Sequence, residues 1–183
     1  RKTMRFYLYI ILSLLILNSC GNKEETAIPR FKVKPEVPAQ ILEDHNYFLE
    51  KLKPFTSYED STGIAARELY EVMEFHFKEE EDYILPPLGI LPLLAKGELP
   101  EESGKIVQLI EKFRENREAM LAEHQMIAHF IDEMVTAAGR ENHPELSGYE
   151  AELEKHAELE EEILFPTVLL LGDYLKLREE NNQ

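Results

Sequence analysis

The 183-residue sequence contains a single cysteine, Cys20. One cysteine cannot form a disulfide within the chain, and it cannot build a metal site rich in thiolates. Any metal ion held by this protein must therefore be bound through nitrogen and oxygen atoms. The length fits one domain of ordinary size.

Strand-type patterns and positive charge are also scarce. Alternation of β-branched residues is nearly absent beyond residue 38, where proline and glycine punctuate long stretches of helix formers, so we predict an all-α fold. The sequence has 20 basic residues against 36 acidic ones, spread over segments with regular apolar spacing. This pattern is typical of solvated helix faces, and we expect no nucleic-acid partner.

The first residues follow a different pattern. Arg1, Lys2 and Arg5 precede an uncharged, apolar-rich run over residues 6–17. A helix needs about 20 apolar residues to span a bilayer, so this run is too short for a permanent transmembrane anchor. Basic residues followed by a short apolar run are the layout of an export signal.

The end of this run resembles a bacterial lipobox, in which the cysteine becomes the lipid-modified first residue of the mature protein. Leu17, Ser19 and Cys20 fit the motif, whereas Asn18 is less usual. The resemblance implies a signal peptide over residues 1–19, lipidation of Cys20, and export to a bacterial outer membrane, on its periplasmic side or at the cell surface. A plain signal peptide with an incidental cysteine is the alternative.

Prolines divide the rest of the chain. Residues 20–38 are polar and contain three prolines, so we expect a tether there and a folded domain over residues 39–183. Proline and glycine then mark the ends of four long helices, which short connections would arrange as an antiparallel up-down four-helix bundle. The predicted helices cover about residues 39–53, 61–85, 100–138 and 144–164, and an extra short helix over 167–178 is expected to pack across the bundle.

Two of these helices carry the same pair of residues on their apolar line. His76 and Glu80 lie four residues apart in the second helix, and His156 and Glu160 have the same spacing in the fourth. Residues at steps of three and four share one face of a helix, so both pairs are expected to point inward. The other positions on these two lines are Leu69, Met73, Tyr83, Tyr149, Leu153 and Ile163.

The first and third helices each bring one more histidine to the interior. His45 lies on the apolar line of the first helix, and His124 lies on that of the third. Arg117 also falls on the third line, although a buried guanidinium needs a partner, so we expect its aliphatic stem to reach toward one end of the bundle.

Buried imidazoles and carboxylates are costly unless a cation balances their charge and uses their lone pairs. Two divalent ions could each take two imidazoles, with the glutamates bridging or binding terminally and one position open for a small molecule. A lone core histidine is usually only hydrogen-bonded, and a lone His-x-x-x-Glu pair is usually a surface ion pair, so a metal-free bundle is the alternative. The predicted metal ligands are His45, His76, Glu80, His124, His156 and Glu160.

Other polar residues near these positions are weaker candidates for metal binding. Glu81 and Glu161 lie about 100° further round their helices than the predicted ligands, so we expect carboxylates at the rim of the site. His129 is expected to be exposed or hydrogen-bonded elsewhere. Tyr83 and Tyr149 face inward as core aromatics, with donation to a bound oxygen species as the alternative.

These residues resemble the hemerythrin-like, or HHE cation-binding, family, which has single histidines on the first and third helices and His-x-x-x-Glu before a proline on the others. The resemblance covers about residues 39–166 and implies a non-haem di-iron site with the same six residues as iron ligands. Oxygen-carrying hemerythrins have a second histidine where Ala128 stands and an aspartate where Glu160 stands, so the resemblance does not extend to the ligand set of the oxygen carriers. Four histidines and two glutamates are more similar to iron–sulfur-repair di-iron proteins and to eukaryotic iron-sensing domains.

The sequence therefore predicts an exported, lipid-anchored di-iron protein that binds or senses O2, NO or iron. Two alternatives stay open: a redox enzyme acting on nitric oxide or peroxide, and an envelope interaction module with a vestigial metal site. Zinc and manganese are alternative occupants, because imidazole and carboxylate ligands accept all three metals.

Overall fold

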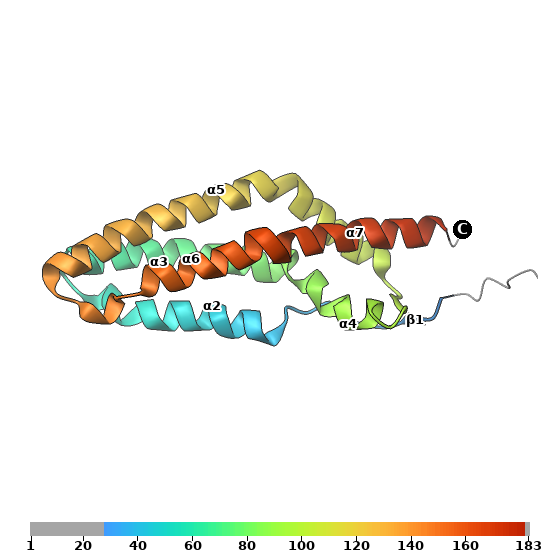
Figure 1. The fold of residues 1–183 in the computed structure, drawn as a ribbon, viewed down its shortest axis with the longest axis horizontal. Helices are drawn as coiled ribbons and strands as arrows, with labels where there is room; N and C mark the ends of the chain where they lie inside the picture. The colour runs from blue at the N-terminus through green and yellow to red at the C-terminus, as the bar shows by residue number, and fades with distance from the viewer. Residues whose placement is uncertain (1–27, 182–183) are drawn as a thin grey trace, which may run out of the picture.

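The structure is a computed structural model that describes residues 28–181 and consists mainly of α-helices (Figure 1). The predicted all-α class is confirmed. The α-helices are α2 (Ala39–Leu52), α3 (Ser61–Glu79), α4 (Leu91–Leu94), α5 (Ser103–Glu141), α6 (Tyr149–Leu159) and α7 (Phe165–Glu180). Single 3₁₀ turns cover Lys53–Ser57, Pro86–Ile90 and Pro144–Leu146.

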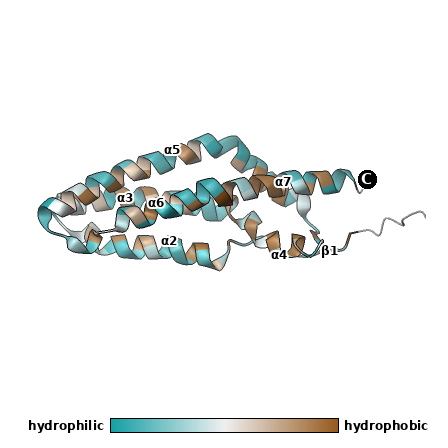
Figure 2. Ribbon diagram, in the orientation of Figure 1, coloured by the Kyte–Doolittle hydropathy of each residue, from teal (hydrophilic) through white to brown (hydrophobic). Residues whose placement is uncertain are grey.

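The helices α2, α3, α5 and α6 lie side by side, and α7 continues beyond them along the first half of α5 (Figure 1). Each long helix carries both polar and apolar residues (Figure 2), as expected for helices that bury one face. The buried apolar side chains form two clusters. One contains Leu52, Leu69, Met73, Ile131 and Tyr149, and the other contains Ile84, Ile106, Phe113, Phe165 and Val168. Among the described residues, no helix is both long and apolar enough to cross a membrane.

Two π-helical turns interrupt the helices where the predicted glutamate ligands stand. One covers Glu80–Ile84 after α3, and the other covers Glu160–Leu164 after α6. In each turn the backbone N–H five residues on, at Leu85 and at Phe165, donates to the carbonyl of the glutamate. Such turns widen a helix by one residue and are frequent at functional sites.

The second π turn changes the predicted course of the chain. A C-terminal helix is present, but α7 starts at Phe165 and continues the line of α6 instead of packing across the bundle (Figure 1). Pro166 does not end the helix, because the wide turn before it leaves room for the proline ring. The prediction that Ile163 points inward is wrong: its side chain is 55% exposed, since the extra residue moves the buried position to Phe165.

Arg117 was also predicted on an inward line, and this is wrong. All residues from 114 to 119 are exposed, whereas Phe113 and Met120 on either side are buried. In Figure 1 the long helix α5 bends in its first half. None of the residues from 114 to 119 is buried, so Arg117 has no interior to enter.

Residues 28–38, expected to belong to a tether, contact the domain. β1 (Arg30–Phe31) pairs in parallel with β2 (Leu99–Pro100), and the Arg30 guanidinium donates to both carboxylate oxygens of Glu179 at 2.7 and 3.0 Å. Gly89 lies so close to this segment that a Cβ atom would stand 2.3 Å from the Glu36 carbonyl oxygen. In the described part of the chain, packed structure thus begins before α2.

Candidate metal centre

All six residues predicted as metal ligands meet in the interior. The histidines come one each from α2, α3, α5 and α6, and the two glutamates open the two π turns. Their exposed fractions range from 0 to 8%, so water scarcely reaches them. The six residues are His45, His76, Glu80, His124, His156 and Glu160.

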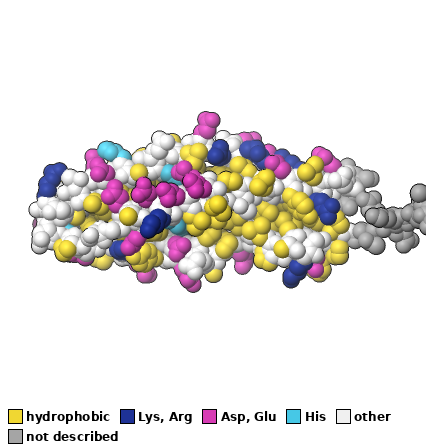
Figure 3. All heavy atoms as spheres, viewed as in Figure 1, with side chains coloured by type: hydrophobic (Ala, Val, Ile, Leu, Met, Phe, Trp, Pro, Cys, Tyr) yellow, Lys and Arg dark blue, Asp and Glu magenta, His cyan; other side chains and the backbone are white. Residues whose placement is uncertain are grey.

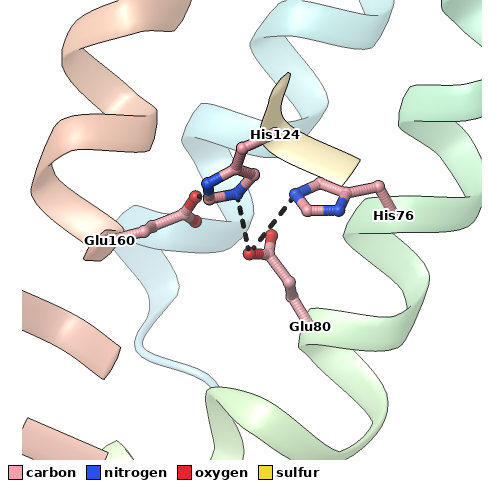
Figure 4. Close-up of side chains that lie close together, drawn as sticks. All are labelled: His76, Glu80, His124 and Glu160. Carbon is pink, nitrogen blue, oxygen red and sulfur yellow. Dashed lines mark ion pairs between the residues drawn. The ribbon is translucent and has the colours of Figure 1, made fainter. Parts of the chain in front are cut away.

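Glu80 reaches histidines on three helices. Its Oε1 lies 3.5 Å from Nε2 of His76 and 3.8 Å from Nε2 of His124 (Figure 4). Its Oε2 lies 3.5 Å from Nε2 of His45. The two oxygens of this carboxylate therefore face different histidines.

Glu160 has the complementary arrangement. Its Oε1 lies 3.1 Å from Nε2 of His156 and 3.5 Å from Nε2 of His45, whereas its Oε2 lies 3.5 Å from Nε2 of His124. The four imidazoles thus form two pairs, His76 with His124 and His45 with His156. Each carboxylate directs one oxygen to each pair.

Several of these buried atoms have no hydrogen-bond partner among the described residues. They are Nε2 of His45, His124 and His156, both carboxylate oxygens of Glu80, and Oε1 of Glu160. Leaving buried polar atoms unpaired is costly, and native structures contain few of them. Nitrogen and oxygen atoms that converge on one place without hydrogen-bonding one another fit a bound cation, which would pair all of them at once.

Further glutamates hold the outer nitrogens of three of these histidines. Nδ1 of His45 lies 2.8 Å from Glu81, that of His124 lies 2.7 Å from Glu161, and that of His76 lies 3.0 Å from Glu123. Glu81 and Glu161 were predicted at the rim of the site. Glu123 was missed, although it adjoins the predicted ligand His124 as Glu81 adjoins Glu80 and Glu161 adjoins Glu160.

Burial dominates the electrostatics of the cluster. Burial, with a contribution from nearby Glu160, raises the pKa of Glu80 to about 8, and burial lowers the pKa of His76 to about 3. Burial also acts to lower the pKa of His124, but the surrounding carboxylates outweigh it and raise that pKa to about 10. The opposite shifts mean that protons balance the cluster when no cation is bound, so metal binding would displace protons.

A cavity of about 290 Å³ opens beside the cluster, between α3, α5 and α6. Apolar side chains, among them Met73, Ile127 and Ala128, form much of its wall, and His156 also lines it. Its exposed part carries acidic residues such as Glu154. A small neutral molecule could therefore reach the histidines from solvent.

The remaining polar candidates lie elsewhere. His129 is exposed and its nearest acidic partner is Glu133, at 3.5 Å. The Tyr149 hydroxyl donates to the Phe48 carbonyl at 3.0 Å, and the Tyr83 ring packs under the Lys112 ammonium. Neither tyrosine is thus directed at the cluster.

A third acidic group, formed by Asp60, Glu141 and His143, also has a geometry that could hold a cation. In this group the carboxylates already accept hydrogen bonds from the protein. Glu141 accepts hydrogen bonds from the backbone N–H groups of Ser61 and Thr62, and Asp60 accepts from Gly63 and contacts His143 at 2.8 Å. This group caps the start of α3 and leaves no converging lone pairs unpaired.

An all-helical fold with a buried cluster of histidines and glutamates defines a class of helical proteins that bind metal cations. Within this class, the family model described as the hemerythrin HHE cation binding domain matches residues 36–168. The chain belongs to this family, and the resemblance seen in the sequence is confirmed. No curated protein and no solved structure matches the chain.

Proposed function

We propose that the cluster would hold two metal ions, one at His76 and His124 and the other at His45 and His156, with Glu80 and Glu160 supplying the carboxylate oxygens. The observation that carries this proposal is the set of buried, unpaired nitrogen and oxygen atoms, together with carboxylates that direct one oxygen to each histidine pair. A vestigial site would have no reason to keep all six groups desolvated.

We propose iron as the natural occupant. Nitrogen and oxygen ligands accept iron, zinc and manganese alike, so the family membership favours iron more than the ligand types do. When bound, iron would supply reversible binding of small molecules and one-electron chemistry. The residues around it would hold the imidazoles in place, exclude bulk water and provide the route from solvent.

For the ligand, we propose a small uncharged molecule such as O2 or NO, or iron itself as the sensed species. The apolar wall of the cavity admits such molecules, while its acidic exposed part disfavours anions. A redox enzyme acting on nitric oxide or peroxide is the second candidate. The observation that favours it is Glu161, which contacts His124 and also lines the cavity, where its carboxyl group could deliver protons.

We also propose that the four side-by-side helices form the antiparallel up-down bundle predicted from the sequence. Supporting this, the chain runs in alternating directions through α2, α3, α5 and α6 when followed by colour in Figure 1. In such a bundle, metal sites are built from inward side chains of facing helices. The contribution of one histidine by each helix agrees with this.

Export and lipid anchoring at Cys20 are likewise proposals, since residues 1–19, the expected signal peptide, and Cys20 lie outside the described residues. Two features of the domain support a membrane-facing end at α7. Charge is unequally divided: residues 39–85 and 119–164 contain 24 acidic and six basic residues, whereas residues 28–38, 86–118 and 165–181 contain ten of each. The neutral part also exposes Leu170 and Leu177, and Figure 3 shows hydrophobic side chains gathered over α7 and α4.

The metal proposal is tested by loading the full chain, in detergent, with ferrous iron under anaerobic conditions. We expect two irons per chain and a change in the visible absorption spectrum when oxygen or nitric oxide is admitted. His76→Ala and His156→Ala should each abolish the binuclear stoichiometry, while His129→Ala, at an exposed position, should not. Absence of tight metal binding in the wild-type chain would overturn the proposal.

The two candidate activities are separated in the same preparation. Binding or sensing predicts a stable adduct with oxygen or nitric oxide and no turnover. Sustained consumption of nitric oxide or peroxide, lost in His76→Ala, would instead identify an enzyme.

A further inference from the structure

We infer that the two metal positions are unequal, and that the pair His76 and His124 fills before the pair His45 and His156. The difference is set by glutamates outside the ligand set. This inference rests on the proposed two-metal function and deepens it by assigning Glu123 and Glu161 as positioning residues of the first position and Glu81 as that of the second.

Both histidines of the first pair, His76 and His124, have a glutamate as hydrogen-bond partner on the side away from the cluster. Nδ1 of His76 donates to Glu123 at 3.0 Å, and Nδ1 of His124 donates to Glu161 at 2.7 Å. A hydrogen bond at Nδ1 orients the ring, so that Nε2 is the nitrogen that faces the centre of the cluster. Both imidazoles are therefore held in the orientation that metal binding requires.

Only one histidine of the second pair, His45, has such a glutamate partner. His45 donates to Glu81 at 2.8 Å. For His156, no hydrogen bond at Nδ1 occurs within residues 28–181, and its ring is held by packing against the rings of Phe48, Phe77 and His45. Ring packing restrains orientation but does not choose between the two protonation sites of a neutral imidazole, so binding a metal at His156 must fix the tautomer as well.

The size of the effect follows from the usual role of such partners. Loss of an outer hydrogen-bond partner of a histidine ligand typically weakens metal binding by about 10–100-fold. One missing partner predicts a difference of this order between the two positions. The protein would then pass through a form with one metal ion over a tenfold or wider range of free metal concentration.

Stepwise binding alone is not sufficient support, because two nearby cations repel each other and the second would bind more weakly at either position. The inference concerns which histidines bind first. It therefore needs a measurement that resolves the individual imidazoles.

The full chain, labelled with ¹⁵N at histidine and held in detergent, can be titrated with Zn²⁺ while the imidazole nitrogen resonances are followed. We expect the Nε2 signals of His76 and His124 to shift during the first equivalent and those of His45 and His156 during the second. Simultaneous shifts, or shifts of His45 and His156 first, would overturn the inference while leaving the two-metal proposal intact. No shift at any ratio would overturn both.

Matched substitutions test the cause. Glu123→Gln should weaken the first binding step about 10–100-fold, and Glu81→Gln should leave the first step unchanged and weaken the second by a similar factor. Glu133→Gln, which changes an exposed carboxylate on the same helix as Glu123, should alter neither step. Equal weakening of both steps by Glu123→Gln and Glu81→Gln would show that the outer glutamates act on the cluster as a whole, and would overturn the assignment.

Discussion

At the scale of single residues, helical periodicity was sufficient to find the six candidate ligands. His45, His76, His124 and His156 lie on apolar lines of regular helices, and a side chain on such a line enters the interior where other helices cover that face. The contact between Glu123 and His76 could not be found in this way, because it depends on how α3 and α5 pack together and on the reach of a half-buried side chain. The sequence signal for Glu123 is its place next to the predicted ligand His124, and that signal does not say which histidine the carboxylate contacts.

Tyr149 illustrates how a residue close to the site can be structural. Its ring is fully buried, its hydroxyl donates to the Phe48 carbonyl, and burial raises the pKa of the phenol above its ordinary range. The phenol therefore stays protonated at all ordinary pH values and is already bonded. Tyr149 ties α6 to α2 next to His45 and His156 without facing the proposed metals.

We predict that Tyr149→Phe lowers the free energy of unfolding by about 1 kcal/mol, the usual net value of one buried hydrogen bond. Urea denaturation of the metal-free protein measures this loss. Metal stoichiometry and the spectrum of the iron-loaded protein should match those of the wild type. A changed spectrum would show that the phenol interacts with the bound ligand, contrary to the geometry.

At the scale of elements, the positions of the helices were predictable and their local irregularities were not. Proline and glycine marked most of the helix ends. The π turns at Glu80 and Glu160 instead depend on backbone hydrogen bonds between residues five apart, and the spacing of apolar residues in the sequence does not predict them. The extra residue in the second turn explains why Ile163 is exposed and why Pro166 does not stop the helix. The bend of α5 explains why Arg117 is exposed. Residues on the apolar line of a helix are buried only where other helices pack against that face.

The start of α3 is an element whose stability depends on a distant carboxylate. Glu141, at the end of α5, accepts hydrogen bonds from the hydroxyl and N–H of Thr62 and from the N–H of Ser61. These bonds, with the Thr62 hydroxyl first, lower the pKa of Glu141 to about 2 from an ordinary 4.5. A carboxyl with a lower pKa in the folded state stabilises the fold above the unfolded-state value and loses that contribution as the pH falls toward the folded-state value.

We therefore predict that Glu141→Gln reduces stability most at neutral pH and progressively less between pH 4.5 and about 2. The urea midpoints of variant and wild type should differ at pH 7 and approach each other near pH 2.5. Glu59→Gln, which changes a carboxylate in the same loop region, should follow the wild type throughout. A difference that is constant with pH would mean that the Glu141 charge does not support the fold.

At the scale of the whole molecule, the unequal division of charge between its two halves suggests an orientation. The half that contains the metal cluster carries 24 acidic and six basic residues, and the half around α7 is neutral. Anionic membrane surfaces repel the first half over distances of about a Debye length, so a bound molecule would keep the metal centre away from the bilayer. The described chain begins at the neutral end, at Ile28, and the eight Cα–Cα steps that separate Cys20 from Ile28 can span at most about 29 Å.

This orientation is testable because the sequence contains no tryptophan. Leu177→Trp places a single fluorophore on the exposed apolar face of α7, and Ile64→Trp places one at the start of α3, far along the molecule; the two side chains are 58% and 51% exposed. In the full chain bound to vesicles of phosphatidylcholine and anionic phosphatidylglycerol, we expect the emission of the first variant to shift to the blue and to be quenched by brominated lipid. The second variant should emit as in water, because its tryptophan would face away from the membrane. Equal quenching in both variants, or in neither, would contradict an α7 end that rests on the bilayer. A blue shift of the first variant without lipid would instead indicate contact between two copies of the chain.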